Sequence, residues 1–295
     1  MRGADQDEFL AGAGIDQVAS DAELALLDRA NPTAKQAQAW LRDLQRLPPI
    51  PPSADKLDPG LRFTFLNTTM LVRRDPIKTL NLLAILTGRP RPLPRGESPE
   101  AQPALVDSVD WDSLSAGNVW YDRLVAAHRI KDRAAREKEI DRIEEEVKAL
   151  EKDTGTPAAV IEALRGGNAS GKEVSKKLEY FLRDFFLILI RQLRRAADRT
   201  EQAQRNLHLA FALAAYRGER GRYPEKLDAL ASKYLEEVPT DLYSGKALIY
   251  RPSENEYLLY SIGVNGLDEQ GHGHDDTPPG DDPSIRMPQR ELKRK

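Results

Sequence analysis

The feature that most constrains the fold is a helical pattern that begins at Ser170 and continues to Tyr216. Ser170 and Glu173 form a capping box, in which each side chain pairs with a backbone amide at the helix start. Eight apolar residues then cover more than half of the helix surface: Leu178, Phe181, Leu182, Phe185, Phe186, Leu189, Ile190 and Leu193. A face this wide is buried against more than one neighbour, so a helix of about 45 residues organises the chain.

The first part of the chain predicts shorter helices separated by prolines. A capping box at Ser20–Glu23 and the Asn31-Pro32 pair are helix-start signals. We expect four helices here, over about 20–29, 32–47, 61–72 and 76–87. Residues 89–104 contain five prolines, which exclude a helix or a central strand. This segment is typical of a linker, and the alternative is a PxxP ligand for a partner.

Residues 110–152 predict one long, solvated helix, because charges of both signs alternate densely from 129 to 153. Ile140, Ile143, Val147 and Leu150 form a short apolar seam at 3-4-3 spacing. The economical partner for this seam is the long helix after Ser170, folded back as an antiparallel hairpin. A small helix opened by Pro157 and closed by Gly166-Gly167 lies between the two.

After Gly218 the pattern changes to short elements. We expect a short helix over 224–233 and two strands, 247–251 and 257–262, joined by a turn at Pro252–Asn255. Two short strands cannot stand alone, so the sheet must pack on the end of the long helix. The predicted fold class is α+β: a mostly α-helical first two-thirds with a long helical hairpin, then a small antiparallel sheet. The predicted regions are 1–104, 105–198, 199–288 and a basic tail, 289–295.

Composition excludes several classes of protein. The chain has no cysteine, which removes disulfide scaffolds, thiolate metal sites and cysteine nucleophiles. Its net charge of −3 argues against a general nucleic-acid binder. The longest strongly apolar block, Phe185–Ile190, is too short to span a membrane. The first residues do not form a signal peptide, so localisation stays unknown; the cell envelope or periplasm is the alternative if the true start lies upstream.

The charge is unevenly distributed along the chain. Residues 252–285 hold eight acids and no Lys or Arg, a formal charge of −8, so the remainder carries +5. Five glycines make this acidic segment adaptable. Carboxylates together with exposed backbone carbonyls suit Ca²⁺, although the spacing is not that of an EF-hand. A solvated acidic loop without an ion is the alternative.

Two histidines in the same segment raise a second possibility. His272 and His274 stand close to Asp275 and Asp281, and imidazole with carboxylate ligands can hold zinc or another transition metal. A metal-dependent enzyme is therefore the alternative function. No HExxH, GxSxG or P-loop motif accompanies these residues.

Several motifs from about Arg199 to Pro288 occur in an informative order. They are G-R-Y-P at 221–224, V-P-T-D at 238–241, S-G-K at 244–246, Y-L-L-Y-S-I-G-V-N-G at 257–266, and Asp281-Asp282. This stretch resembles the globular domain of the major pseudopilin of type II secretion systems. The whole chain also resembles uncharacterised planctomycete-type bacterial proteins that couple a helical first part to such a module.

The resemblance implies a Ca²⁺ site in the loop after the last strand pair. By position, Asn265 matches an aspartate of the family, and Asp281 and Asp282 match its terminal aspartates. Asp268, Asp275 and Asp276 lie in a loop longer than the family's and are further candidate ligands. Residues 1–198 do not match the family's leader and apolar spine, so we do not expect assembly into a pseudopilus by the usual route.

These observations predict a non-enzymatic structural or interaction protein with protein partners. Its C-terminal domain is expected to be stabilised by Ca²⁺ and linked to secretion or the cell envelope. The alternatives are the metal-dependent enzyme and a membrane-peripheral adaptor. The adaptor would use Phe185–Ile190 and the basic tail residues Arg290, Lys293, Arg294 and Lys295.

Overall fold

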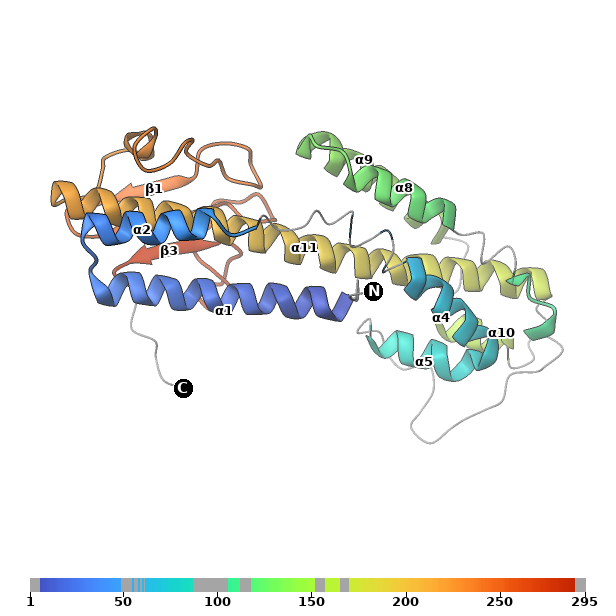
Figure 1. The fold of residues 1–295 in the computed structure, drawn as a ribbon. Helices are drawn as coiled ribbons and strands as arrows, with labels where there is room; N and C mark the ends of the chain where they lie inside the picture. Colours follow the sequence, from blue (N-terminus) through green and yellow to red (C-terminus); the bar gives the residue numbers. More distant parts are fainter. Residues whose placement is uncertain are drawn as a thin grey trace. The chain divides into compact units, whose positions relative to one another are not determined.

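The computed structural model describes residues 6–48, 55, 58, 60, 62–86, 106–111, 118–151, 157–164 and 170–289 (Figure 1). The fold is α+β, as predicted. The chain divides into two compact units. The first comprises Met1–Phe9 and Pro51–Arg194, and the second comprises Leu10–Ile50 and Arg195–Lys295. Residues 10–50 thus group with the C-terminal part of the chain, a long-range association that the region boundaries expected from sequence did not include.

The first unit is helical. Its elements are α4 (Arg62–Arg74), α5 (Pro76–Leu86), α8 (Asn118–His128), α9 (Arg133–Glu151), α10 (Pro157–Leu164) and the first part of α11 (Gly171–Arg220). Two ion pairs fix the direction of α9 on α11: Arg191 pairs with Glu144, and Arg194 Nη1 lies 2.9 Å from Glu137 Oε2. The residue numbers in α9 fall, from 144 to 137, as those of their partners in α11 rise, from 191 to 194. The two helices therefore run antiparallel, and the predicted hairpin is confirmed.

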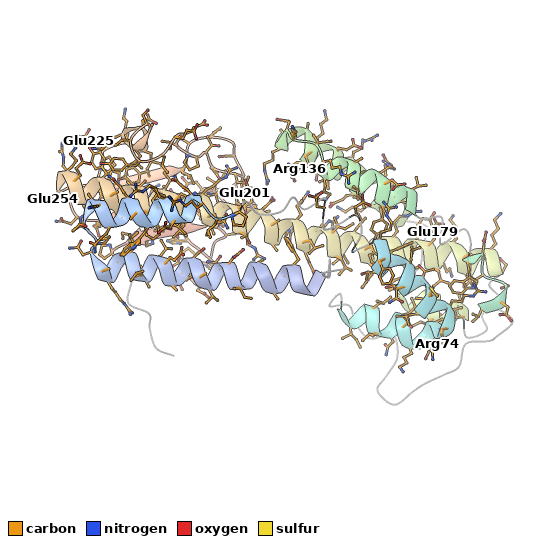
Figure 2. The ribbon with its side chains drawn as sticks, in the orientation of Figure 1. Arg74, Arg136, Glu179, Glu201, Glu225 and Glu254 are labelled. Carbon is orange, nitrogen blue, oxygen red and sulfur yellow. The ribbon has the colours of Figure 1, made fainter. Side chains whose placement is uncertain are left out.

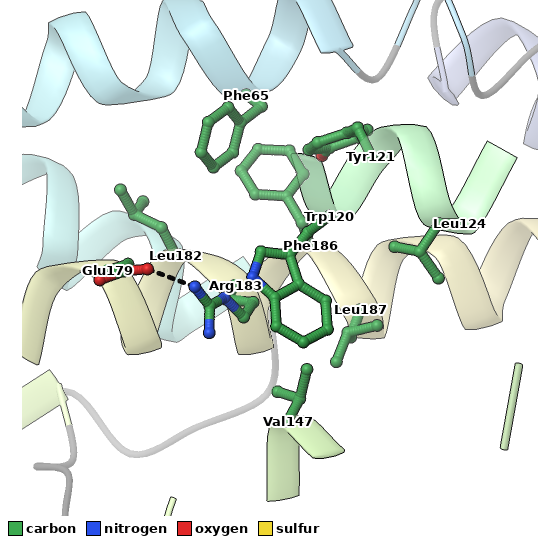
Figure 3. A pocket seen from close by; sticks show the side chains of 10 residues that line it. All are labelled: Phe65, Trp120, Tyr121, Leu124, Val147, Glu179, Leu182, Arg183, Phe186 and Leu187. Atoms are coloured by element: carbon green, nitrogen blue, oxygen red, sulfur yellow. Dashed lines mark hydrogen bonds and ion pairs between the residues drawn. The ribbon is translucent and has the colours of Figure 1, made fainter. Parts of the chain in front are cut away.

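The wide apolar face of α11 is the core of this unit. All eight apolar residues named from the sequence are buried, as are Ile140, Ile143 and Val147 of the α9 seam. The Leu150 side chain lies outside the described residues. Phe65, Tyr121 and Phe186 form an aromatic cluster, with ring centroids 5.2–5.9 Å apart (Figure 3). The apolar side chains of Phe185–Ile190 are thus mostly engaged in packing, which weakens the prediction that they meet a lipid surface.

The predicted start of α11 is confirmed. The Ser170 N–H donates to Glu173 Oε2 at 2.7 Å, and the Glu173 N–H donates to Ser170 Oγ at 3.4 Å. The helix continues past Tyr216 to Arg220, giving 50 residues. Residues 171–194 belong to the first unit and 195–220 to the second.

Two predicted helix starts were wrong. The helix expected from Ser20 begins instead at Gln6, because the residues before Ser20 are themselves helical and bury Ser20 inside α1 (Gln6–Ala30). The start of α2 (Ala34–Gln45) is a capping box made by Thr33 and Gln36, not by Asn31.

The single helix expected over 110–152 was also wrong. The chain leaves helical geometry after His128 and re-enters it at Arg133, where Asp132 caps α9 by accepting the Ala135 N–H at 2.8 Å. Residues 112–117 of that expected helix lie outside the described residues. The proline-rich segment 89–104, Gly166-Gly167 and the basic tail from Arg290 also lie outside them.

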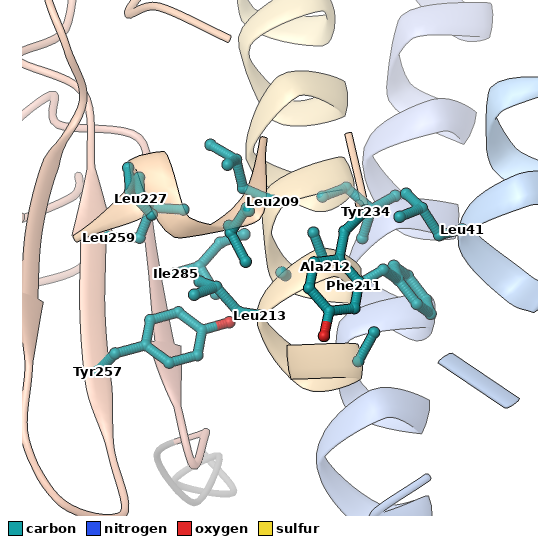
Figure 4. Close-up of a cluster of buried hydrophobic side chains, with 14 of the residues drawn as sticks. Leu41, Leu209, Phe211, Ala212, Leu213, Leu227, Tyr234, Tyr257, Leu259 and Ile285 are labelled. Carbon is teal, nitrogen blue, oxygen red and sulfur yellow. The ribbon is translucent and has the colours of Figure 1, made fainter. Parts of the chain in front are cut away.

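The second unit has three layers. A sheet packs on one side of the last turns of α11, and α1 and α2 pack on the other (Figure 4). Leu209 and Leu213 meet Leu259 and Ile285 of the sheet in one buried cluster. On the opposite side, Phe211 lies edge-on to Trp40 of α2, with ring centroids 6.2 Å apart. Residues 209–213 of α11 are all buried, because apolar residues occupy every face of the helix there.

The sheet has three antiparallel strands in the order β1 (Ile249–Pro252), β2 (Tyr257–Tyr260) and β3 (Ser284–Met287). The central register pairs Tyr250 with Leu259 and Leu259 with Ile285. The sequence predicted β1 and β2 but missed β3. The helix expected over 224–233 is only a 3₁₀ turn, η2 (Leu227–Leu230), because the backbone turns at Ser232, whose φ is +66°.

Charged side chains lie mostly on the outside of both units. Figure 2 labels Arg74 in the first unit and Glu225 and Glu254 in the second, all three exposed. Within the described part of the chain, no helix combines the length and apolar character needed to cross a membrane.

A candidate metal site in the loop between β2 and β3

The loop that connects β2 to β3 is held closed at its base. The Ser261 N–H donates to the Pro283 carbonyl at 3.2 Å, and Asn206 Nδ2 of α11 donates to the same oxygen at 3.2 Å. Ser261 Oγ also donates to Asp241 Oδ1. The loop therefore begins and ends at one place on the surface of α11, which brings residues far apart in sequence together.

Three carboxylates meet inside this loop. Glu269, Asp281 and Asp282 each offer an oxygen, and these atoms lie within 4.8 Å of one another. Among the described residues, these three are the His, Asp or Glu side chains that lie close enough together, as a group of at least three, to share an ion. We call Glu269, Asp281 and Asp282 the acidic cluster.

Asp282 is the buried member of the acidic cluster. Its side chain is 2% exposed, and its Oδ2 accepts the Glu269 N–H at 3.0 Å and the Gly271 N–H at 2.9 Å. Its Oδ1 is buried with no hydrogen-bond partner among the described residues. Burial raises the pKa of this carboxyl, opposed by the two backbone hydrogen bonds, and the charge of Glu269 raises the pKa further. A buried carboxylate oxygen without a partner is costly, so it needs a proton or a cation.

Asp281 and Glu269 complete the acidic cluster in a space that glycines leave open. Asp281 Oδ2 accepts the Val264 and Asn265 N–H groups, both at 3.1 Å. Gly263 has φ of +66°, and a Cβ there would overlap the Asp281 carboxylate. A Cβ at Gly280 would overlap the Glu269 carboxylate. Both glycines are therefore required by close approach of carboxylates to the backbone.

The structure places the six predicted ligands differently from one another. Asp281 and Asp282 belong to the acidic cluster, and Asn265 borders it, with Nδ2 donating to Glu269 Oε1 at 3.1 Å. Asp268 instead accepts the Tyr260 hydroxyl and the Gln270 N–H, both at 2.9 Å. Asp275 is exposed and Asp276 accepts the Gly273 N–H at 2.9 Å; neither joins the cluster.

Sequence reasoning missed Glu269 as a candidate ligand. It lies 12 residues before Asp281, and no local spacing signals that the loop folds back so far. His272 and His274 are not part of the acidic cluster, and His272 Nδ1 lies 3.0 Å from the Pro278 carbonyl. The predicted set His272, His274, Asp275 and Asp281 therefore does not converge on one centre.

The acidic cluster has the donor chemistry of a hard divalent cation. Its ligand atoms are carboxylate oxygens, in a loop that also contains glycines. Ca²⁺ prefers six to eight such oxygens and tolerates irregular geometry, whereas zinc and copper favour imidazole or thiolate. Of the two aspartates, Asp281 Oδ1 and Asp282 Oδ1 accept no backbone amide, and Glu269 Oε1 accepts only the side-chain amide of Asn265. The residues present fit Ca²⁺ better than a transition metal.

No protein-family model, curated protein or solved structure matches this chain. The pseudopilin resemblance therefore stays a prediction carried by its motifs. Functional assignment rests on the geometry of the second unit.

Proposed function

We propose that this chain is a non-enzymatic structural or interaction protein whose C-terminal α+β unit is stabilised by Ca²⁺ bound at the acidic cluster. The observation that carries the proposal is Asp282 Oδ1, a buried carboxylate oxygen without a hydrogen-bond partner among the described residues. It lies in a group of three carboxylates that repel one another in the absence of a cation.

The role of the ion in this proposal is to fix the loop rather than to perform chemistry. Asp281 and Asp282 already accept four backbone N–H groups from across the loop. An ion that neutralises the two carboxylates would stabilise the folded loop. It would also hold Pro283, the residue after Asp282, in place for its hydrogen bond from Asn206 on α11. The motif resemblance supports a link to secretion or the cell envelope, with protein partners that recognise the ordered unit.

The metal-dependent enzyme has less support, because its four predicted ligands do not share a centre. The membrane-peripheral adaptor is also less well supported, because most of the Phe185–Ile190 side chains pack in the core.

The test is thermal unfolding of the full chain in millimolar Ca²⁺, in Mg²⁺ and in chelator. We expect Ca²⁺ to raise the midpoint, because an ion at one hundred times its Kd stabilises the folded state by about 2.7 kcal/mol. Mg²⁺ should act more weakly, since it demands a smaller octahedral site.

Two matched variants locate the effect. Asp281→Asn removes one member of the acidic cluster and should abolish the Ca²⁺ response. Asp275→Asn removes an exposed charge of the same loop and should preserve it. Equal midpoints in Ca²⁺ and chelator for the unaltered chain would overturn the proposal, and an undiminished response of Asp281→Asn would place the ion elsewhere.

A further inference from the structure

A cavity in the second unit lies at one end of the β2–β3 pair, where Tyr257 and Met287 are paired, and the acidic loop leaves the pair at the other end. Its volume is about 300 Å³, and it is lined by the end of α1, the segment that leads into α2, one face of α11, the start of β2 and the end of β3. This is the lower limit of the size range of small-molecule sites. By contrast, the cavity beside Phe65 and Trp120 in the first unit is only about 20 Å³, room for one water.

Tyr257 forms part of the wall of the larger cavity. Tyr257 is 4% exposed, and its hydroxyl has no hydrogen-bond partner among the described residues. In Figure 4 this hydroxyl points toward α11, whose residues Ala210 and Ala214 form part of the cavity wall. The Tyr223 ring packs edge-on against Tyr257 at 4.9 Å and fixes its orientation. The hydroxyl itself has almost no accessible surface, so Tyr257 offers the cavity an aromatic wall and not a hydrogen-bond donor.

Two opposite charges line the same cavity without pairing with each other. Arg217 donates to the Tyr223 hydroxyl at 3.2 Å, and its guanidinium lies over that ring. Asp28 accepts the Gln289 N–H at 3.1 Å. Among the described residues neither side chain forms an ion pair, although both border one cavity. A cation and an anion that face the same space are complementary to a ligand that carries both charges.

We propose that this cavity binds a small zwitterion of the α-amino-acid class. The ligand carboxylate would meet Arg217, and its ammonium group would meet Asp28. Leu27 and Met287 provide apolar wall for the ligand side chain. This site is separate from the acidic cluster and does not depend on the Ca²⁺ proposal.

The first experiment is a thermal-shift and calorimetric titration of the full chain with leucine, glycine, glutamate and lysine. Each amino acid is added up to about 10 mM, so that a site with a Kd as weak as about 1 mM is still filled. Two half-molecules accompany leucine: 4-methylpentanoate, which lacks the ammonium group, and 3-methylbutylamine, which lacks the carboxylate. We expect at least one amino acid to bind and both half-molecules to bind at least tenfold more weakly. No response to any of the four amino acids, or half-molecules equal to leucine, would overturn the proposal.

Variants test the assigned contacts for the amino acid that binds. Asp28→Asn keeps an acceptor for the Gln289 N–H but removes the charge, and it should weaken binding at least tenfold. Arg217→Gln removes the cation and should also weaken binding at least tenfold. Tyr250→Phe is the control, because its hydroxyl bonds the Pro224 carbonyl outside the cavity. Unchanged affinity in both Asp28→Asn and Arg217→Gln would overturn the assignment.

Discussion

Asn206, on α11, donates from Nδ2 to the carbonyl oxygen of Pro283, the residue that directly follows Asp282 in the acidic cluster. One turn earlier, Gln202 donates to Asn206 Oδ1 at 2.7 Å and accepts the Leu242 N–H at 2.7 Å. Both amides are buried. Two adjacent side chains of a helix therefore hold the segment before β1 and the end of the acidic loop in fixed positions.

This relationship predicts the effect of Asn206→Ala. The change removes the bond to Pro283 and leaves Gln202 Nε2 buried without its acceptor, so we expect the free energy of unfolding to fall by about 1–3 kcal/mol. The Ca²⁺-induced rise in midpoint should also shrink, because Asp282 is less well positioned. Urea denaturation in Ca²⁺ and in chelator measures both effects. Gln204→Ala on the same helix is the control, since Gln204 makes no side-chain hydrogen bond within the described residues.

Asp282→Asn should have two effects of opposite sign. The pKa of Asp282 is raised in the folded state, chiefly by burial, so the folded chain holds this proton more tightly than the unfolded chain. Ionised Asp282 therefore costs stability at pH 7, and that cost disappears as the pH falls through the raised pKa. The neutral amide should stabilise the ion-free chain and abolish its response to Ca²⁺.

Asp268→Asn gives the matched comparison in the same loop. The pKa of Asp268 is lowered, first by the hydrogen bond from the Gln270 N–H and then by that from Tyr260. Its ionised form therefore stabilises the fold at pH 7, and Asp268→Asn should destabilise the ion-free chain while preserving the Ca²⁺ response. Thermal unfolding in chelator measures both effects. If Asp282→Asn and Asp268→Asn shifted the unfolding midpoint in the same direction, this account would be contradicted.

Gly263→Ala tests the packing of the acidic cluster against the backbone. Gly263 and Gly245 have nearly equal φ values, +66° and +68°, so alanine suffers similar backbone strain at both, on the order of 1 kcal/mol. Only at Gly263 does the new methyl group overlap the Asp281 carboxylate. We expect Gly263→Ala to be clearly the more destabilising in urea and to weaken Ca²⁺ binding, and Gly245→Ala to leave Ca²⁺ binding unchanged.

The parts of the fold that sequence predicted are those set by local patterns. The start of α11 follows from Ser170 and Glu173, which act within one turn, and its buried face follows from apolar spacing. Ser20 and Glu23 have the same pattern, yet they lie inside α1, because a capping box starts a helix only where the preceding chain is not already helical. The break before Asp132 was missed because the charges on both sides suit a helix equally well.

The candidate site was less predictable because it depends on long-range folding. Asp281 and Asp282 were named through the motif resemblance, whereas Glu269 reaches them only because Ser261 and Pro283 close the loop. β3 was missed for a related reason, since Ser284–Met287 is a strand only in register with β2. The grouping of α1 and α2 with the sheet unit depends on contacts such as Trp40 with Phe211, which no spacing in the sequence reveals.

His128 gives a prediction for the first unit. It is buried at the end of α8, where burial, followed by the charges of Arg194 and Arg136, lowers its pKa to about 4. Arg194 also pairs with Glu137, with Arg194 Nη1 2.9 Å from Glu137 Oε2. In the unfolded chain the His128 imidazole takes up a proton near pH 6.5, whereas in the folded chain it does so only near pH 4. His128 therefore makes the free energy of unfolding fall as the pH drops from 6.5 to 4.

The maximum cost is about 3 kcal/mol, from 1.36 kcal/mol for each unit of pKa difference. His128→Gln cannot be protonated, so its free energy of unfolding should fall less steeply than that of the unaltered chain over the same interval. Urea denaturation at several pH values between 7 and 4 measures the two slopes. His274→Gln, at an exposed histidine, should keep the slope of the unaltered chain. Equal slopes for His128→Gln and the unaltered chain would show that His128 titrates normally in the folded protein.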